Sequence, residues 1–552
     1  MASLQPIAGP LGHRKAAHLL RRTSFYYTRS RIDALARLSA PEAIKDLMAP
    51  RPLQLEQPLY LKTVGSAPVS WINPPQSPAV PLPAPDFELK RYVIAWWLHE
   101  ALRDTGSRHK LALFFHQFLA VSAESGSSSQ FFDYLALLRW GAFGNFKSLV
   151  TKMILDNCML NFINNNQNFF KNPNENFARE FFELHTVGKG APAGPGDYTY
   201  YTEEDIVQAA RVLTGFGNGF RHNSVDTETG IPAGRANPQS HDFGEKKFSA
   251  RFANTVIKPA TNDVAGMRAE LEAFVDMVFS REETSLNFCR RMYRYLVTRH
   301  IDSETESDII APLAKTLRDN QFETAPVLEL LLQSQHFYDA DDAEAFDENI
   351  GALIKSPLDL TLQTLSFFEV PIPDALTDNY NHYITFYNGG ILERCLSRAG
   401  MELFYPPDVA GYPGYFQNPD LNRQFFNSAT IIARYKLPQM LISGNTSWTG
   451  VAGDPLGTRL DLAKWAKDSG FFTDPSDSYK LVTEWTDYLF PETPSTQRFI
   501  YFLDTVFLDG LPPGDWTYEW EQYVLTGNDT EVKIPLRRLF QALLYAPEYQ
   551  TG

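Results

Sequence analysis

The sequence lacks the features that mark several large classes of protein. It has three cysteines in 552 residues, and their wide separation excludes a closely spaced thiolate metal site and does not fit a disulfide framework. No run of about 18 apolar residues occurs, so we expect no membrane-spanning helix. The first residues lack a basic region followed by an apolar stretch, which predicts no ordinary secretory signal and a cytoplasmic protein.

An excess of positive charge is also missing. The formal net charge is −15, whereas a nucleic-acid partner requires a basic face and a polybasic membrane anchor requires clustered lysine and arginine. We therefore expect neither kind of partner. Hydrophobic residues make up 44% of the chain and aromatic residues 13%, which is enough to build sizeable cores.

Strands that alternate with helices are absent as well, which argues against a doubly wound nucleotide-binding sheet. Apolar residues instead recur at helical spacing along most of the chain. The predicted fold is mainly α, a large multi-helix body with long irregular loops and at most short β segments. We expect N-terminal helices in residues 1–50, a proline-rich extended segment in 51–86, a helical core in 87–340 and a C-terminal helical region in 341–552 packed on that core.

One long loop region is expected inside the helical core. Residues 215–263 are rich in Gly, Asn, Thr and Pro, with short strands expected near 246–257. Loops of this length in a compact domain are usually functional or mobile.

The stretch PNENFAREFFELH, residues 173–185, concentrates charge among phenylalanines and leucines. With Asn172 as the cap, Glu175 falls where a capping box places its carboxylate. Glu175, Arg179 and Glu183 then share one face of the helix, which predicts an exposed ion-pair ladder. This interpretation requires no function.

A functional interpretation uses the other face of the same helix. Glu180 and Glu183 are three residues apart and can present two carboxylates to one cation, as inward-facing carboxylates do in helical-bundle metal sites. A divalent metal ion is therefore a candidate cofactor. His185 follows Glu183 by two residues and points about 200° around the helix, which makes it a poor second ligand.

Histidines elsewhere provide further candidates. His116 is a lone histidine on an otherwise apolar helix, where a hydrogen-bonded core histidine is the usual explanation. In the segment SHDFGEKKF, His241 and Asp242 form a pair that can orient a general base, bind a metal ion or cap a turn. Function and structure are equally well supported there.

Several segments occur in an order that resembles one protein family. They are AAHLLRRTSF, LALFFHQFLAVS, NPNENFAREFFELHTVG, YTEEDIVQAARVLTGF, HDFGEKKF and ELFYPPDVAGYPG. The family is the large bacterial group known as domain of unknown function eighteen hundred, and the resemblance runs from about Ala16 to Leu441. It implies membership without an established reaction. It also implies export or the cell envelope as an alternative location, and a protein partner that resembles a sulfatase or an alkaline phosphatase.

Two positions depart from the pattern of that family. Relatives often carry a second histidine two positions after His116, where this chain has Phe118, so a two-histidine site on that helix is excluded. The position of His185 is often aromatic in relatives, which argues against a catalytic role for His185.

Two hypotheses result. In the first, the 173–185 helix and the 241–246 loop build the polar site of a metal-assisted or acid–base, hydrolase-like enzyme. Its catalytic candidates are His116, Glu180, His241 and Asp242; its substrate-binding candidates are Arg179, Arg211 and Lys246; its metal-ligand candidates are Glu180, Glu183, His241 and Asp242. In the second, the protein is a non-enzymatic binding or assembly protein in which these residues form a structural polar network.

Overall fold

The computed structural model is mainly helical, as the sequence predicts, and in the part of the chain that it describes the sheets have two strands each. The described residues are 2–49, 57–61, 68–72, 81–194, 197–219, 224–341, 348–412, 425–443 and 460–552. Much of the predicted extended segment 51–86 therefore lies outside them. Buried apolar side chains form one contiguous core that extends from Ile7 to Tyr549.

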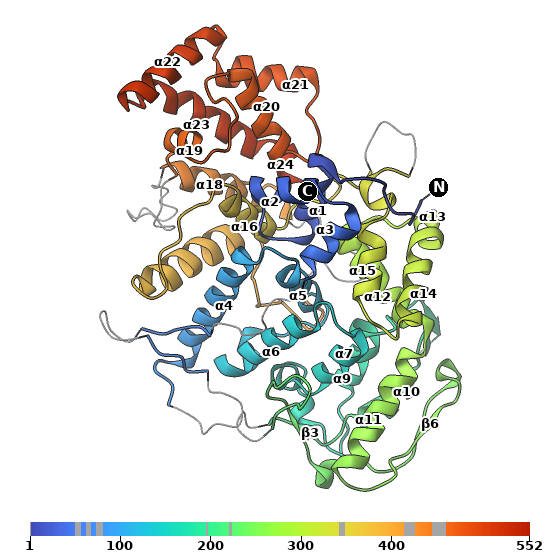
Figure 1. Cartoon of the computed structure of the whole chain (residues 1–552). Coiled ribbons are helices and arrows are strands. Elements are labelled where there is room, and N and C mark those ends of the chain that lie inside the picture. Colours follow the sequence, from blue (N-terminus) through green and yellow to red (C-terminus); the bar gives the residue numbers. More distant parts are fainter. Residues whose placement is uncertain are drawn as a thin grey trace.

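Three helices open the chain. They are α1 (Gly12–Thr23), α2 (Arg29–Ala36) and α3 (Ala40–Leu47). Ile7 donates its backbone N–H to the carbonyl of Gln333 at 2.9 Å, and Arg21 donates to the carbonyls of Tyr488 and Phe490 at 3.0 and 2.8 Å. These N-terminal helices are thus bonded both to the middle of the chain and to its C-terminal helices, between which they lie in Figure 1.

The next helices build the centre of the body. They are α4 (Asp86–Arg103), α5 (Arg108–His116), α6 (Ser128–Gly141), α7 (Phe146–Ile154) and α8 (Asn157–Phe162). Trp96 and Trp97 on α4 are buried in this core. Against α4 packs the π-helix η8 (Asn381–Leu396), from the C-terminal half of the sequence.

The Glu-rich stretch is followed by the long loop, whose strands lie in the lower part of Figure 1. The helices are α9 (Glu175–Glu180), the π-helix η3 (Phe181–His185) and α10 (Glu203–Val212). The strands are β1 (Pro192–Gly194), β2 (Asp197–Tyr198), β3 (Phe216–Gly217), β4 (Arg235–Ala236), β5 (Lys246–Lys247) and β6 (Val256–Ile257). β5 pairs antiparallel with β6, which confirms the short strands expected near 246–257.

Helices resume after the loop, in the regions where the sequence predicts a helical core and a C-terminal helical region. They are α11 (Val264–Phe279), α12 (Glu282–Leu296), α13 (Ser303–Thr305), the π-helix η6 (Glu306–Ile310), α14 (Ala311–Asp319), α15 (Ala325–Leu332) and α16 (Pro357–Phe367). Ser356 caps α16 by accepting a hydrogen bond from the Asp359 N–H at 3.1 Å, and Pro357 occupies the first helical position. Within the C-terminal helical region expected in 341–552, α16 is the first helix among the described residues.

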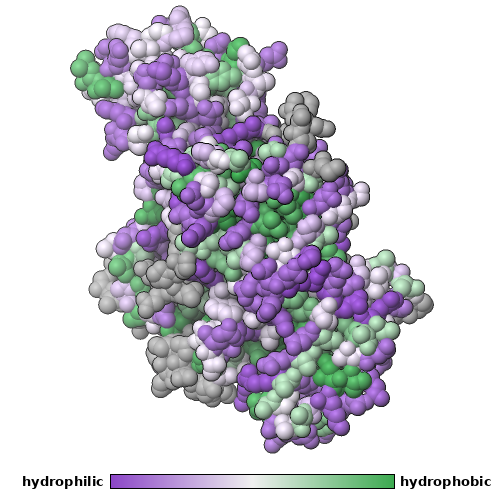
Figure 2. Space-filling model, turned by 45° about the vertical axis from the view of Figure 1, so that its right-hand side comes forward, coloured by the Kyte–Doolittle hydropathy of each residue, from purple (hydrophilic) through white to green (hydrophobic). Residues whose placement is uncertain are grey.

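The C-terminal helices gather at the end of the molecule opposite to β3 and β6 (Figure 1). They are α18 (Thr430–Ser443), α19 (Leu462–Asp468), α20 (Ser478–Leu489), α21 (Thr496–Ile500), the π-helix η11 (Tyr501–Phe507), α22 (Pro513–Thr526), α23 (Thr530–Tyr545) and α24 (Pro547–Gln550). No helix among the described residues is both long and apolar enough to span a membrane. On the face shown in Figure 2, apolar residues form separate patches among hydrophilic ones.

Candidate functional site

The Glu-rich helix begins two residues later than predicted. Asn174, and not Asn172, is the cap, and its Oδ1 accepts a hydrogen bond from the backbone N–H of Asn176 at 3.0 Å. Asn172 belongs to a preceding turn, in which its N–H donates to the carbonyl of Phe169 at 2.9 Å. The predicted capping box at Glu175 is therefore wrong, because this turn displaces the start of the helix.

Arg179 is held by a carboxylate from a neighbouring helix. Its two terminal nitrogens donate to the two oxygens of Glu203, at the start of α10, at 2.8 and 2.7 Å. This paired hydrogen bonding raises the pKa of Arg179. Glu175 lies 3.7 Å from the same guanidinium, which confirms that half of the predicted ladder. The ion pair between Arg179 and Glu203 therefore joins α9 to α10.

Glu183 lies in the π-helix and does not complete the ladder. One extra residue per turn changes which side chains share a face. Glu183 contacts the Lys189 ammonium at 3.2 Å and accepts a hydrogen bond from the Tyr201 hydroxyl at 3.3 Å. Glu183 already has a cationic partner, so its carboxylate is not a free ligand for a metal ion. Its negative charge acts instead on the neighbouring carboxylate of Glu180.

Glu180 is different, because Arg179 and Lys189 lie near enough to favour its charge but neither forms an ion pair with it among the described residues. Among the described residues, no hydrogen bond or ion pair to its half-buried carboxylate is present. Desolvation and the nearby charge of Glu183 raise the pKa of Glu180 to about 7. Asp408, from a loop far along the chain, adds to this repulsion. A carboxyl group of this pKa can exchange protons near neutral pH.

The loop histidine is enclosed in a buried network. His241 Nδ1 lies 2.7 Å from the carbonyl of Thr214, and Nε2 lies 2.7 Å from Oε2 of Glu270 on α11. The other oxygen of Glu270 lies 2.5 Å from the ammonium of Lys246. The side chains of His241, Glu270 and Lys246 are all completely buried. Lys246 also donates to the backbone carbonyl of Asp242, which ties the loop to itself.

Asp242 forms a second pair, with Arg211 on α10. Arg211 Nε lies 2.7 Å from Oδ2 of Asp242, and Arg211 also donates to Gln208 at 2.6 Å and to the carbonyl of Glu245 at 2.9 Å. Although burial opposes it, hydrogen bonds from Arg211 and from the Gly244 N–H hold the pKa of Asp242 below its usual value. Arg211 and Asp242 thus fasten the loop to α10.

His116 is a core histidine. It is completely buried, and its ring nitrogens lie 2.7 Å from the Tyr134 hydroxyl and 3.2 Å from the Tyr412 hydroxyl. Desolvation lowers the pKa of His116 to about 3, so the ring is neutral at ordinary pH. Phe404 packs edge-on against the ring, with centroids 4.9 Å apart.

The predicted site residues therefore fall into separate groups. Arg211, His241, Asp242 and Lys246 lie together, while Glu180 and Glu183 lie on η3 and its preceding helix. Among the residues that the structure describes, no hydrogen bond or ion pair connects Glu180 with His241 or Asp242, and no three or more His, Cys, Asp or Glu side chains are grouped to hold a metal ion.

Comparison with protein families matches residues 18–551 to a family described as "Protein of unknown function (DUF1800)". The chain belongs to the DUF1800 family. No curated protein and no solved structure matches it. The match continues well beyond Leu441, where the resemblance of the sequence motifs was expected to fade, so the C-terminal helices are part of the DUF1800 unit.

Two carboxylates that organise this DUF1800 protein were not among the sequence candidates. Glu203 is the partner of Arg179, and Glu270 is the partner of both His241 and Lys246. For Glu270 a signal exists, since it shares a helix face with Met267, Leu271 and Phe274, all buried. A glutamate on an apolar face requires a buried partner. Glu203 carries no such signal, because the first turn of most helices is acidic.

Proposed function

We propose that this DUF1800 protein is a non-enzymatic binding or assembly protein in which the 241–246 loop, α10 and α11 form a structural polar network. The observation that supports this best is the pairing of His241, Glu270 and Lys246, fully buried and bonded to one another. The two ring nitrogens of His241 face the Thr214 carbonyl and the Glu270 carboxylate, each at 2.7 Å. Both nitrogens are thus occupied by groups of the protein itself, which leaves neither open to a metal ion or a substrate.

Energetics support the same interpretation. A buried charge is strongly destabilising when unpaired, and tolerable when it is paired and hydrogen-bonded. Lys246 has Glu270 and the Asp242 carbonyl as partners, and Asp242 has Arg211. Such a network stabilises one arrangement of the loop and the helices, and its charged groups are already bonded to other groups of the protein.

The test is a Glu270→Gln substitution, which keeps the shape of the side chain and removes its charge. We expect the free energy of unfolding to fall by about 3 kcal/mol or more, because Lys246 is left buried without a counter-ion. Urea denaturation of the parent and the variant measures this loss, and elemental analysis of both proteins accompanies it.

Glu180→Gln is the matched control, since no hydrogen bond or ion pair to a described residue is lost and this variant should not be destabilised. The proposal fails if Glu270→Gln leaves stability unchanged, or if the parent holds a stoichiometric metal ion that Glu270→Gln loses.

One observation favours a second candidate function, acid–base catalysis at Glu180. Its carboxyl group has a pKa of about 7 and no hydrogen-bond partner within the described ranges. A general acid or base works best with a pKa near the operating pH. We propose Glu180 as the proton carrier of a hydrolase-like reaction, with Glu183 maintaining the raised pKa.

A panel of chromogenic ester substrates tests this candidate. Glu180→Gln should lower any turnover by about 100-fold, the lower end of the usual contribution of a general acid or base. Glu175→Gln, on the same helix and beside the same Arg179, should not. Equal turnover in the parent and in Glu180→Gln would rule out this role.

A further inference from the structure

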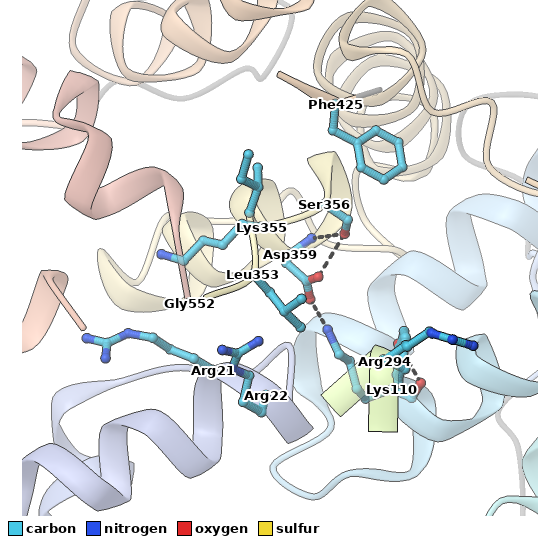
Figure 3. Close-up of a pocket in the computed structure, with 12 residues that line it drawn as sticks. Arg21, Arg22, Lys110, Arg294, Leu353, Lys355, Ser356, Asp359, Phe425 and Gly552 are labelled. Carbon is cyan, nitrogen blue, oxygen red and sulfur yellow. Dashed lines mark hydrogen bonds and ion pairs between the residues drawn. The ribbon is translucent and has the colours of Figure 1, made fainter. Parts of the chain in front are cut away.

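A pocket of about 40 Å³ lies between the end of α1, α5, α12 and the segment that leads into α16 (Figure 3). Arg21 and Arg22 approach it from α1, while Lys355 and Asp359 approach it from the opposite side. A cavity needs a volume of about 10–15 Å³ to hold a single water molecule, so this pocket has room for a group of a few heavy atoms. Residues 353 and 354 on its wall are partly exposed, which connects it to the surface.

The side chains that line this pocket are strongly unbalanced in charge. Five are cationic: Arg21, Arg22, Lys110, Arg294 and Lys355. Asp359 is the one carboxylate side chain among the described lining residues, and it is already bonded to Lys110 and to the Ser356 hydroxyl. We refer to these residues as the cationic pocket. Gly552 also lines the wall, next to Arg21 and Lys355, and the positive charges still outnumber the negative ones when a carboxyl group at Gly552 is counted with Asp359.

The two arginines of α1 are buried and form no ion pair with a carboxylate among the described residues, although Asp339 and Asp359 lie near enough to favour the charge of Arg22. Each is 3% exposed. Arg21 donates to the carbonyls of Tyr488 and Phe490, and Arg22 donates to the carbonyl of Asn349 at 2.5 Å. On both guanidinium groups, Nε and Nη1 are buried and have no hydrogen-bond acceptor among the described residues. Buried donors of this kind are rare in folded proteins and require a partner.

Lys355 is equally short of partners. It is 6% exposed, and its ammonium lies 4.1 Å from the centre of the Tyr549 ring, with no hydrogen bond or ion pair to any described residue. Arg434 lies behind the pocket and donates to the Lys355 carbonyl at 2.9 Å, while its Nη2 is buried without an acceptor. Burial and neighbouring cations lower the pKa of Lys355 and bring that of Arg22 to about 9.

We propose that the cationic pocket binds a small oxyanion with more than one negative charge, phosphate or sulfate, either free or as the terminal group of a monoester. The unpaired guanidinium N–H groups of Arg21 and Arg22 match the oxygens of such a group, and Lys355 adds a point charge. The bound anion supplies the missing acceptors and the missing negative charge. The proposal uses none of the residues of the 241–246 network, so either proposal can fail alone.

The experiment follows the melting temperature of the full chain against added inorganic phosphate, sulfate or phenyl phosphate, at constant ionic strength set with chloride. Binding to the folded state gives a saturable rise, of roughly 2 °C or more. Both anions also stabilise proteins without binding, but that effect grows steadily with concentration. Saturation by phenyl phosphate alone identifies a monoester group as the ligand, and saturation by the inorganic ions identifies a free anion.

Lys355→Met separates a binding site from a structural cation. Without added phosphate this variant should melt at a higher temperature than the parent, because an unpaired buried charge is removed. It should also lose the saturable rise. The matched control is Lys90→Met: Lys90 is just as buried, but it contacts Glu124 at 3.1 Å and Asp86 at 3.7 Å. This control should melt lower than the parent and keep the saturable rise.

Anion that stays bound through purification is measured by ion chromatography after acid denaturation of the dialysed proteins. If the parent releases stoichiometric phosphate or sulfate and Lys355→Met releases none, the result supports anion binding in the cationic pocket as fully as a saturable rise does. The proposal is overturned if the parent releases no anion and shows no saturable rise, or if Lys355→Met behaves as the parent does.

Discussion

Glu180 carries a prediction about stability and pH. Its pKa is raised from 4.5 to about 7 by desolvation and by Glu183, so the folded protein holds a proton that the unfolded chain has lost between these values. Ionisation of Glu180 therefore costs stability as the pH rises from about 4.5 to about 7. Glu180→Gln should be more stable than the parent above about pH 7, by about 1–2 kcal/mol once solvent screening is considered.

Urea denaturation across this pH range measures the difference between the parent and Glu180→Gln. The gain should vanish toward pH 4.5, where Glu180 is protonated in both states. Glu175→Gln removes a contact with Arg179 and should show no gain at higher pH. A difference that does not change with pH would mean that Glu180 is ionised alike in both states.

Single residues show where sequence reasoning reaches its limit. Thr202 caps α10, and a cap of this kind depends on residues that are neighbours in the sequence. The His116 environment agrees with the core interpretation, which needed only an apolar helix around it. Which carboxylate meets His241 could not be predicted, since Glu270 is far along the chain and a separate helix brings it there. The cationic pocket was missed for the same reason, because its residues come from distant segments.

At the scale of elements, Asp205 joins α10 to the loop. Its carboxylate accepts hydrogen bonds from the N–H and hydroxyl of Thr202, both at 2.9 Å, and from the N–H and hydroxyl of Ser249, both at 2.7 Å. It is completely buried. Asp205→Ala should reduce the free energy of unfolding by about 3 kcal/mol or more, because it leaves these donors unpaired in the interior.

The matched variant is Asp263→Ala, at the cap of α11. Asp263 accepts from the Gly266 N–H at 2.9 Å and from the Thr261 hydroxyl at 2.7 Å, but it is exposed. Water can replace its hydrogen bonds, so its loss should be clearly smaller than that of Asp205→Ala. Chemical denaturation followed by circular dichroism compares the two. Equal losses would show that Asp205 stabilises the first turn of α10 together with Thr202 and does not hold the loop.

Elements also explain which parts of the fold were predictable. Most helices follow from apolar spacing and local caps, and the paired strands β5 and β6 lie where β-forming residues flank a turn. The π-helix η3 does not follow from spacing. It shifts Glu183 out of the predicted ladder, and one extra residue in a turn has no signature in the apolar pattern.

At the scale of the whole molecule, the described contacts join regions that the sequence separates. The boundaries expected near residues 50, 86 and 340 stay predictions, but bonds cross them. Gln363 donates to the carbonyl of Arg21 at 3.0 Å, and Arg21 donates to the carbonyl of Phe490 at 2.8 Å. The C-terminal helices therefore share a core with the N-terminal ones, and that core is contiguous.

This contiguity predicts that the protein unfolds in one cooperative step. Trp485 on α20 is completely buried, and Trp485→Ala should cost about 3–5 kcal/mol through the cavity that it leaves. In differential scanning calorimetry, the entire heat absorption peak should move to lower temperature, because the core around α20 continues into the rest of the molecule. Tyr479→Ala is the control on the same helix, since Tyr479 is 60% exposed and its loss should leave the peak in place. If Trp485→Ala instead splits the peak and moves one part alone, the C-terminal helices are an independent unit, and the cationic pocket then lies at a junction between two units whose separation would open it.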